Sequence, residues 1–213
     1  MKQYKTYLFD VDGTLLDTTE LIFQSFLNTC RKYANFEIKR EEVYKHIGIP
    51  LRTQLELYLG KKSDTEYEDL FNEHRLYQQS IYKKTLKAYS GVVEGLAKLK
   101  EKDVQMGVVS SRTRDSLDRY LKYVGIFDLF SVISTPEITK NHKPHPEPVL
   151  WALEQFGAKA ADTIFIGDAT VDIKSGNSAG VDTAFVSWGH NSIEDIKSEP
   201  DYIVNHFDEL FAR

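Results

Sequence analysis

Two aspartates, one residue apart, end the first apolar run of the chain, in the segment Tyr7-Leu8-Phe9-Asp10-Val11-Asp12-Gly13-Thr14. A strand turns alternate side chains to the same face, so Asp10 and Asp12 would share a face if the strand continued. Gly13 indicates instead a tight turn that brings the backbone close to a ligand. Two carboxylates on such a turn repel each other, and a divalent cation, a shared proton or both would explain them. For this segment alone, an ordinary strand-to-turn exit is the alternative.

Similar polar groups follow two later apolar runs. Ser110-Ser111-Arg112 follows one, and Gly167-Asp168-Ala169-Thr170-Val171-Asp172 follows another. Open parallel sheets bind ligands at the carboxyl ends of their strands, so we expect these groups to line one pocket. Lys143 opens the segment Lys143-Pro144-His145-Pro146-Glu147-Pro148, whose prolines stiffen the chain and suit the start of a helix.

These residue types suit metal-dependent chemistry on a phosphate. Asp10, Asp168 and Asp172 are oxygen donors of the kind that a hard cation such as Mg²⁺ prefers. Lys143 offsets the remaining negative charge and can grip an anion, and Ser110 can hydrogen-bond a phosphate together with backbone N–H groups at a helix start. A free carboxylate can then act as nucleophile, while a second one transfers a proton to the leaving group.

The elements that must position these residues alternate along most of the chain. After Tyr89, helices and strands follow one another, a pattern typical of a parallel sheet with helices on both faces. Between Asp17 and Lys87 only helical patterns occur. The sequence therefore predicts an α/β core, residues 1–16 plus 87–213, with an all-helical cap domain, residues 17–86, inserted after the first strand. The expected strands are 6–9, 104–109, 130–133, 163–166 and 183–186, and the expected core helices are 92–100, 114–123, 146–156 and 171–179.

The composition limits the function further. The 213 residues are 41% hydrophobic and 28% charged, and the chain is long enough for one sizeable core, or for one core with a smaller domain attached. A net charge of −5 and a pI near 5.7 argue against a nucleic-acid binder. The single cysteine, Cys30, excludes an intrachain disulfide and is expected to be a buried, inert thiol. No stretch is apolar enough for a signal peptide or a membrane span, so a cytoplasmic protein with no membrane partner is expected.

The polar groups together resemble, in order, the four signature motifs of the haloacid dehalogenase-like superfamily. They are Asp10-Val11-Asp12-Gly13-Thr14, Val109-Ser110-Ser111, Lys143 and Gly167-Asp168-Ala169-Thr170-Val171-Asp172. The helical insertion is similar to that of the superfamily's phosphatases with a cap of the first type. The similarity extends to the closing Asp201-Tyr202-Ile203-Val204. It implies a Rossmann-like parallel sheet sandwiched by helices.

The resemblance also implies a role for each matched residue. Asp10 would be the nucleophile and a ligand of Mg²⁺, and Asp12 the general acid/base, whose backbone carbonyl also binds the metal. Ser110 would hold the transferring phosphoryl group, and Lys143 would neutralise it. The remaining matches are Asp168 as a metal ligand, Asp172 as an indirect or alternate one, and Gly13, Thr14 and Ser111 as substrate-binding residues.

Within the superfamily, the closest resemblance is to phosphoglycolate phosphatases and their bacterial pyrophosphatase relatives. Haloacid dehalogenases lack the second aspartate, so Asp12 favours phosphoryl transfer. Sugar phosphomutases typically carry a histidine a little after the first motif, where this chain has Leu21-Ile22-Phe23. The segment Ile47-Gly48-Ile49-Pro50-Leu51-Arg52 resembles the loop that closes over the leaving group. Arg52 would bind a carboxylate or second phosphate there, or be an exposed arginine at a helix start.

The sequence leaves the roles of two segments open. The second motif departs from the Thr-Asn-Lys triplet common in these phosphatases, and we expect Arg112 to alter the rim of the pocket and the preferred substrate. The Trp188-Gly189-His190 loop follows a strand end, where a hydrophobic plug is expected first and a substrate contact second.

The sequence thus predicts an Mg²⁺-dependent phosphatase, a phosphoric monoester hydrolase, that works through a phospho-Asp10 intermediate. Its substrate would be a small phosphorylated metabolite, either a phosphoglycolate-like monoester or pyrophosphate. A sugar phosphomutase and a non-catalytic metabolite sensor on the same scaffold are the alternatives. No nucleic-acid partner is expected, and both a monomer and a homodimer are compatible with the sequence.

Overall fold

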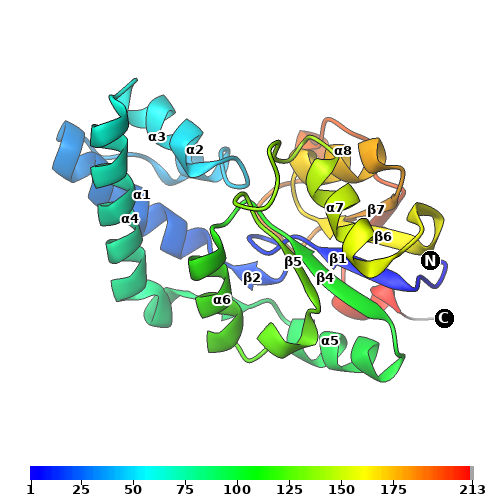
Figure 1. The fold of residues 1–213 in the computed structure, drawn as a ribbon. Coiled ribbons are helices and arrows are strands. Elements are labelled where there is room, and N and C mark those ends of the chain that lie inside the picture. Colours follow the sequence, from blue (N-terminus) through cyan, green and yellow to red (C-terminus); the bar gives the residue numbers. More distant parts are fainter. Residues whose placement is uncertain (212–213) are drawn as a thin grey trace. The chain divides into compact units, whose positions relative to one another are not determined.

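Six parallel strands in the order β5-β4-β1-β6-β7-β8 form one sheet in the computed structural model, which describes residues 1–211 (Figure 1). The central strand β1 (Thr6–Phe9) pairs with β4 (Gln105–Val109) on one side and with β6 (Thr163–Gly167) on the other. Because the strands run in one direction, their carboxyl ends lie along one edge of the sheet. The outer strands are β5 (Val132–Ser134), β7 (Asp182–Val186) and β8 (Tyr202–Val204).

The central strand is apolar because helices cover both faces of the sheet. Leu8 belongs to a buried cluster with Val149 and Leu153, on the face where α7 and α8 pack. Phe9 points to the other face and stacks on Phe207, with ring centroids 6.0 Å apart. The helices of this unit are α5 (Val92–Glu101), α6 (Arg114–Tyr123), α7 (Glu147–Phe156) and α8 (Thr170–Ala179), with short 3₁₀ turns at Phe127–Leu129, Ala160–Asp162, Ile193–Asp195 and Phe207–Leu210.

The strand order places a topological switch point at β1. From β1 the chain reaches β4 and then β5 on one side, and afterwards it returns to β6 on the other side. The loops that follow β4 and β6 therefore leave the sheet in opposite directions. Such a division opens a crevice at the carboxyl ends of the central strands, where open α/β sheets bind ligands.

The chain divides into two compact units, and the second, Thr18–Leu86, contains only helices. Helices α1 and α4 pack against each other around a core that includes Phe26, Leu55 and Leu70. Ser63 caps the long helix, since its hydroxyl accepts from the Glu66 N–H at 3.3 Å. The four helices are α1 (Thr19–Ala34), α2 (Arg40–Tyr44), α3 (Leu51–Leu59) and α4 (Asp64–Thr85).

The fold-class prediction is confirmed: a parallel sheet lies between helices, and a helical segment follows the first strand. One expected strand, 130–133, starts later, at Val132. The Phe130 N–H closes the preceding 3₁₀ turn by donating to the Phe127 carbonyl at 3.3 Å, so it does not enter the sheet. The sequence did not predict the antiparallel pair of β2 (Leu16–Asp17) and β3 (Lys87–Ala88), because two-residue strands carry no alternation.

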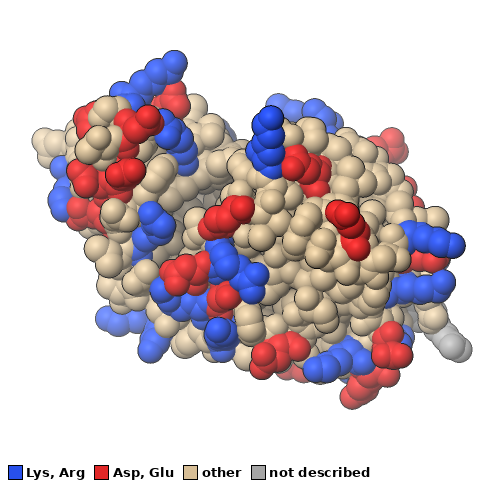
Figure 2. All heavy atoms as spheres, viewed as in Figure 1, with Lys and Arg blue, Asp and Glu red and all other residues tan. Residues whose placement is uncertain are grey.

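The surface carries both signs of charge. In Figure 2, lysine and arginine side chains are interspersed with aspartate and glutamate over the face of the α/β unit that is drawn. Among residues 1–211, no helix combines the length and the apolar character needed to cross a bilayer.

The burial of Cys30 allows a first prediction. Cys30 is fully buried in the helical core, and burial raises the pKa of its thiol from 9.0 to about 11. Few thiolates exist at pH 8, so we expect the native protein to react with Ellman's reagent at least about 100-fold more slowly than the same protein in guanidinium chloride. Release of thionitrobenzoate at 412 nm measures both rates, and rapid labelling of the native protein would contradict the buried position.

Candidate active site

The turn after β1 places both aspartates of the first motif. The Asp10 N–H still donates to the Ile166 carbonyl at 2.8 Å, so Asp10 continues the sheet ladder. Gly13 then adopts φ +88°, and a Cβ at this position would lie 2.2 Å from Oδ2 of Asp168. The turn therefore requires glycine, both for its backbone conformation and for its close approach to Asp168.

Lys143 forms the polar centre of the site. Its ammonium donates to Oδ1 of Asp10 at 2.5 Å, to Oδ1 of Asp172 at 2.7 Å and to the Val109 carbonyl at 3.1 Å. A lysine has three N–H donors, and all three are used. Burial alone lowers the pKa of Lys143, but the carboxylates of Asp10 and Asp172 outweigh it and raise the pKa above the ordinary 10.5. Lys143 is thus a fixed cation between the ends of β1, β4 and the start of α8.

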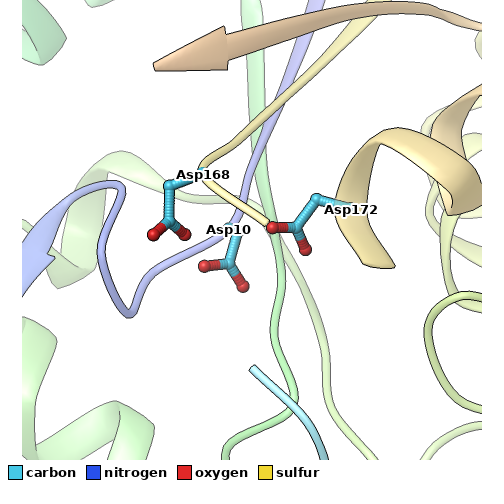
Figure 3. Close-up of side chains that lie close together, drawn as sticks. All are labelled: Asp10, Asp168 and Asp172. Atoms are coloured by element: carbon cyan, nitrogen blue, oxygen red, sulfur yellow. The ribbon is translucent and has the colours of Figure 1, made fainter. Parts of the chain in front are cut away.

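Three carboxylates converge beside this ammonium. Figure 3 shows the side chains of Asp10, Asp168 and Asp172 pointing into one space, and one oxygen of each lies within 4.8 Å of the others. All three residues are buried. Burial, together with the charges of Asp172 and Asp10, raises the pKa of Asp168 well above its usual value. Burial likewise raises the pKa of Asp10, although Lys143 opposes the shift.

The charges of this cluster fit a divalent cation. Three carboxylates less one ammonium leave two negative charges in a buried space. No hydrogen bond from residues 1–211 occupies Oδ2 of Asp10. The contacts of Asp168 with Thr14 at 3.5 Å and Asn191 at 3.4 Å are at the limit of hydrogen bonding. Asp10 and Asp168 therefore offer oxygen ligands of the type that hard cations take.

Asp172 differs from the other two carboxylates. Its Oδ1 accepts from Lys143 at 2.7 Å, and its Oδ2 accepts from the Ala169 N–H at 3.1 Å. Asp172 thereby fixes the lysine and the first turn of α8, where the N-terminal dipole also favours a negative charge. A metal would compete with these donors, so the geometry suits the indirect role that the resemblance implies for Asp172.

The end of β4 contributes a hydroxyl to the same edge of the sheet. The Ser110 N–H donates to the Ser134 carbonyl at 3.0 Å, and its Oγ accepts from the Arg112 N–H at 3.2 Å. Ser110 is buried, whereas Ser111 is half-buried. The Ser110 hydroxyl keeps its own proton for donation, as a group that holds a phosphate oxygen must.

Arg112 lies in a different environment from the expected rim. Its Nη2 and Nε contact the two carboxylate oxygens of Asp12 at 2.5 and 3.1 Å, and its side chain is only 9% exposed. The two residues are 100 positions apart in the chain, so no local pattern indicates that they pair. Arg112 thus contacts the aspartate for which the resemblance implies the role of general acid/base, and its expected effect on the preferred substrate stays a prediction.

Sequence reasoning also missed polar contacts from the loop after β7. The ring of His190 brings Nδ1 to 3.1 Å from Oδ2 of Asp168, and the Asn191 amide donates to the Asp168 carbonyl at 3.0 Å. Trp188 partly resembles the expected plug, because its ring packs against Phe207 while its indole N–H donates to the Thr14 carbonyl at 2.9 Å. The loop thus supports Asp168, and its position after a strand end was the only signal for it.

Arg52 belongs to the helical unit. Its Nη2 donates to Oδ1 of Asp64 at 2.7 Å, and its guanidinium lies over the Tyr67 ring at 4.3 Å. Both contacts are within the helical unit. A role for Arg52 in binding a substrate anion stays a prediction.

The arrangement has the parts that phosphoryl transfer requires. Asp10 offers an unbonded oxygen beside a fixed cation, Ser110 offers a donor, and Asp12 is a second carboxylate on the same turn. Transfer of a phosphoryl group depends mainly on positioning and on stabilisation of negative charge. The site supplies both from residues that lie far apart in the sequence.

Comparison with known proteins agrees with this geometry. The sequence model of the haloacid dehalogenase-like hydrolase family matches residues 7–186. The pyrophosphatase PpaX of Bacillus velezensis is 34% identical over 210 residues, which cover 98% of this chain and 95% of that protein. Two crystal structures share the fold. They are a haloacid dehalogenase-like hydrolase of Bacteroides fragilis, described as putative (TM-score 0.90, 25% identity, 98% and 100% of the two chains), and a predicted phosphoglycolate phosphatase of Haemophilus somnus (TM-score 0.87, 24% identity, 99% and 98%).

The family model extends from the first sheet strand to β7 and so includes every residue of the buried cluster. The relative from Bacillus velezensis matches over nearly the whole length of both chains. The resemblance inferred from the four motifs is therefore confirmed, and the chain belongs to the haloacid dehalogenase-like hydrolase family.

Proposed function

We propose that this protein is an Mg²⁺-dependent phosphatase of small phosphorylated metabolites. The observation that carries the proposal is the state of Asp10, which has one oxygen on Lys143 and the other unbonded. A carboxylate in this position is oriented, yet still has a lone pair directed at a substrate. The identity with a pyrophosphatase over nearly the full length of both chains supports the same class of reaction.

In the proposed reaction, Oδ2 of Asp10 attacks phosphorus, and the bond to the leaving oxygen breaks. Asp12 gives its proton to that oxygen, then takes a proton from the water that hydrolyses the aspartyl-phosphate and restores Asp10. Ser110 and Ser111 hold oxygens of the phosphoryl group, and Lys143 offsets its charge. Gly13 and Thr14 keep the turn close to Asp168.

Asp10 and Asp168 would hold the proposed cation, with the backbone carbonyl of Asp12 as a further ligand, and Asp172 would act indirectly through its contact with Lys143. When bound, Mg²⁺ would neutralise the two excess negative charges and polarise the phosphoryl oxygens. Mg²⁺ suits an all-oxygen site that provides few protein ligands, because this ion retains several waters.

The helical unit is proposed as the cap of this enzyme, with residues 17–86 as the cap and 1–16 plus 87–213 as the core. Lids of this kind exclude water from a site and select among substrates. Arg52 is the proposed contact with a carboxylate or second phosphate of the substrate. We place the enzyme in the cytoplasm, as a monomer or a homodimer.

The substrate class is tested with purified protein and a panel that contains pyrophosphate, phosphoglycolate and hexose phosphates. We expect Mg²⁺-dependent release of inorganic phosphate, with the highest kcat/KM for pyrophosphate or a small phosphomonoester. The relative from Bacillus velezensis is named a pyrophosphatase, and the similar structure from Haemophilus somnus is named a predicted phosphoglycolate phosphatase. Phosphate release is measured with malachite green. Isomer without free phosphate would indicate a mutase, and no turnover of any compound would favour a sensor.

Replacement of the nucleophile gives the sharpest result. Asp10→Asn should lower phosphate release by several orders of magnitude, because the amide is a poor nucleophile and no other one lies at this position. The variant should stay folded, since Lys143 keeps its contact with Asp172. The control is Asp162→Asn, an exposed aspartate paired with Lys5, which should retain wild-type activity. Activity of Asp10→Asn above about a tenth of the wild type would contradict the mechanism.

The crowded carboxylates predict how pH and metal affect stability. Burial and neighbouring charges raise the pKa of Asp10 from 3.8 to about 7 and also raise that of Asp168. The folded, metal-free protein therefore binds protons that the unfolded chain has released, and it loses stability as pH rises from about 4 to above 7.

Mg²⁺ should remove this loss. We expect MgCl₂ to raise the Tm of EDTA-treated protein by several degrees at pH 8 and by less at pH 5, as followed by circular dichroism. Asp168→Asn should abolish the rise at pH 8, because it removes one ligand and one of the two excess charges. An equal rise in the variant would place the cation elsewhere.

A further inference from the structure

Arg112 and Asp12 form a two-pronged ion pair inside the α/β unit. Nη2 donates to Oδ1 at 2.5 Å, and Nε donates to Oδ2 at 3.1 Å. The side chains are 9% and 13% exposed, so water screens the pair little. A planar guanidinium that meets a carboxylate in this way fixes the orientation of the carboxylate as well as its position.

The guanidinium is itself fixed by its surroundings. It lies over the ring of Tyr120, at 4.7 Å from the ring centroid, and that tyrosine is 1% exposed on α6. The backbone N–H of Arg112 donates to Oγ of Ser110 at 3.2 Å. One residue thus connects the hydroxyl proposed to hold the phosphoryl group with the carboxylate proposed to protonate the leaving group.

We propose that Arg112 is a positioning residue that acts through Asp12 and determines how well the site expels poor leaving groups. This inference rests on the proposed function, in which Asp12 transfers a proton to the leaving oxygen. Arg112 holds the Asp12 carboxylate at the end of β1. When one oxygen of Asp12 takes up the proton that it will donate, the other oxygen still accepts from the guanidinium, so the acid keeps its orientation. Because general acid catalysis matters most for a leaving oxygen that is strongly basic, alkyl phosphates depend on Arg112 more than aryl phosphates do.

A direct contact between Arg112 and the substrate is the competing role. The structure favours positioning, because Nη2 and Nε of the guanidinium are engaged by Asp12 and one face of the group lies against Tyr120. A lysine in the same place would give a single point charge without the fork. The two roles differ in one respect: a positioning residue loses its effect when Asp12 is replaced, and a substrate contact does not.

The test measures phosphorylation of Asp10 in single turnovers stopped with acid, using glycerol 3-phosphate and 4-nitrophenyl phosphate. In Arg112→Met we expect phosphorylation by the alkyl ester to slow about 10- to 100-fold and that by the aryl ester to change less than about 3-fold. Arg112→Lys should recover part of the rate of phosphorylation by the alkyl ester, because lysine restores the positive charge but not the two-pronged contact with Asp12. The control is Arg114→Met, which removes an exposed pair with Asp118 on the same helix and should change neither rate.

A double variant separates positioning through Asp12 from a direct contact with the substrate. Asp12→Asn/Arg112→Met removes both charges, so no buried charge is left unpaired. In this double variant, Asp10 should become phosphorylated at the same rate as in Asp12→Asn alone, within about 2-fold, with either ester. Equal rates mean that Arg112 acts only through Asp12. The dependence of the Arg112→Met effect on the ester, which a loss of structure would not produce, excludes a purely structural role.

Two results would overturn the inference. One is an equal loss with both esters in Arg112→Met, and the other is a further loss in the double variant relative to Asp12→Asn. Each would make Arg112 a substrate contact or a structural residue. Failure of the wild type to form phospho-Asp10 with either ester would instead overturn the proposed function itself, so the two failures are distinguishable.

Discussion

The structure depends on one electrostatic constraint, the crowding of three buried carboxylates around a single buried ammonium. Lys143 contacts Asp10 and Asp172 directly, whereas the carboxylate of Asp168 has the His190 ring at 3.1 Å and long contacts with Thr14 and Asn191. Two negative charges are left over among buried residues. The repulsion between these charges stabilises neither the site nor the fold. In the proposed function, a divalent cation and a phosphate would use these charges when they bind.

The rest of the α/β unit serves to bring these groups together. β1 lies in the centre of the sheet and pairs with β4 on one side and with β6 on the other. The carboxyl ends of these three strands are therefore adjacent. Glycines then allow the loops to approach the acidic groups. A Cβ at Gly13 would overlap the carboxylate of Asp168, and one at Gly189 would lie 2.7 Å from the Cβ of the same residue. The carboxylates therefore lie close enough to repel each other because Gly13 and Gly189 have no side chain.

Much of this could be predicted from the sequence, because it follows short-range rules. The alternation of helical and strand patterns predicted the parallel sheet. Apolar runs that end in polar residues predicted that Asp10, Ser110 and Asp168 lie at the carboxyl ends of strands. The pairing of Arg112 with Asp12 could not be predicted, since it depends on which side chains meet across two strands. The contacts of His190 and Asn191 with Asp168 were missed for the same reason. Contacts between residues that lie far apart in the chain, at the carboxyl edge of the sheet, leave no periodic pattern in the sequence.

The central claim is that Asp10 presents a free oxygen to phosphorus while it shares one cation with Asp168. The most direct test is a crystal structure of the protein with Mg²⁺ and beryllofluoride, a stable mimic of a phosphoryl group on aspartate. We expect beryllium to be bonded to Oδ2 of Asp10, with Mg²⁺ in contact with both Asp10 and Asp168 and with the mimic. An unmodified Asp10, or an ion bound away from both aspartates, would contradict it.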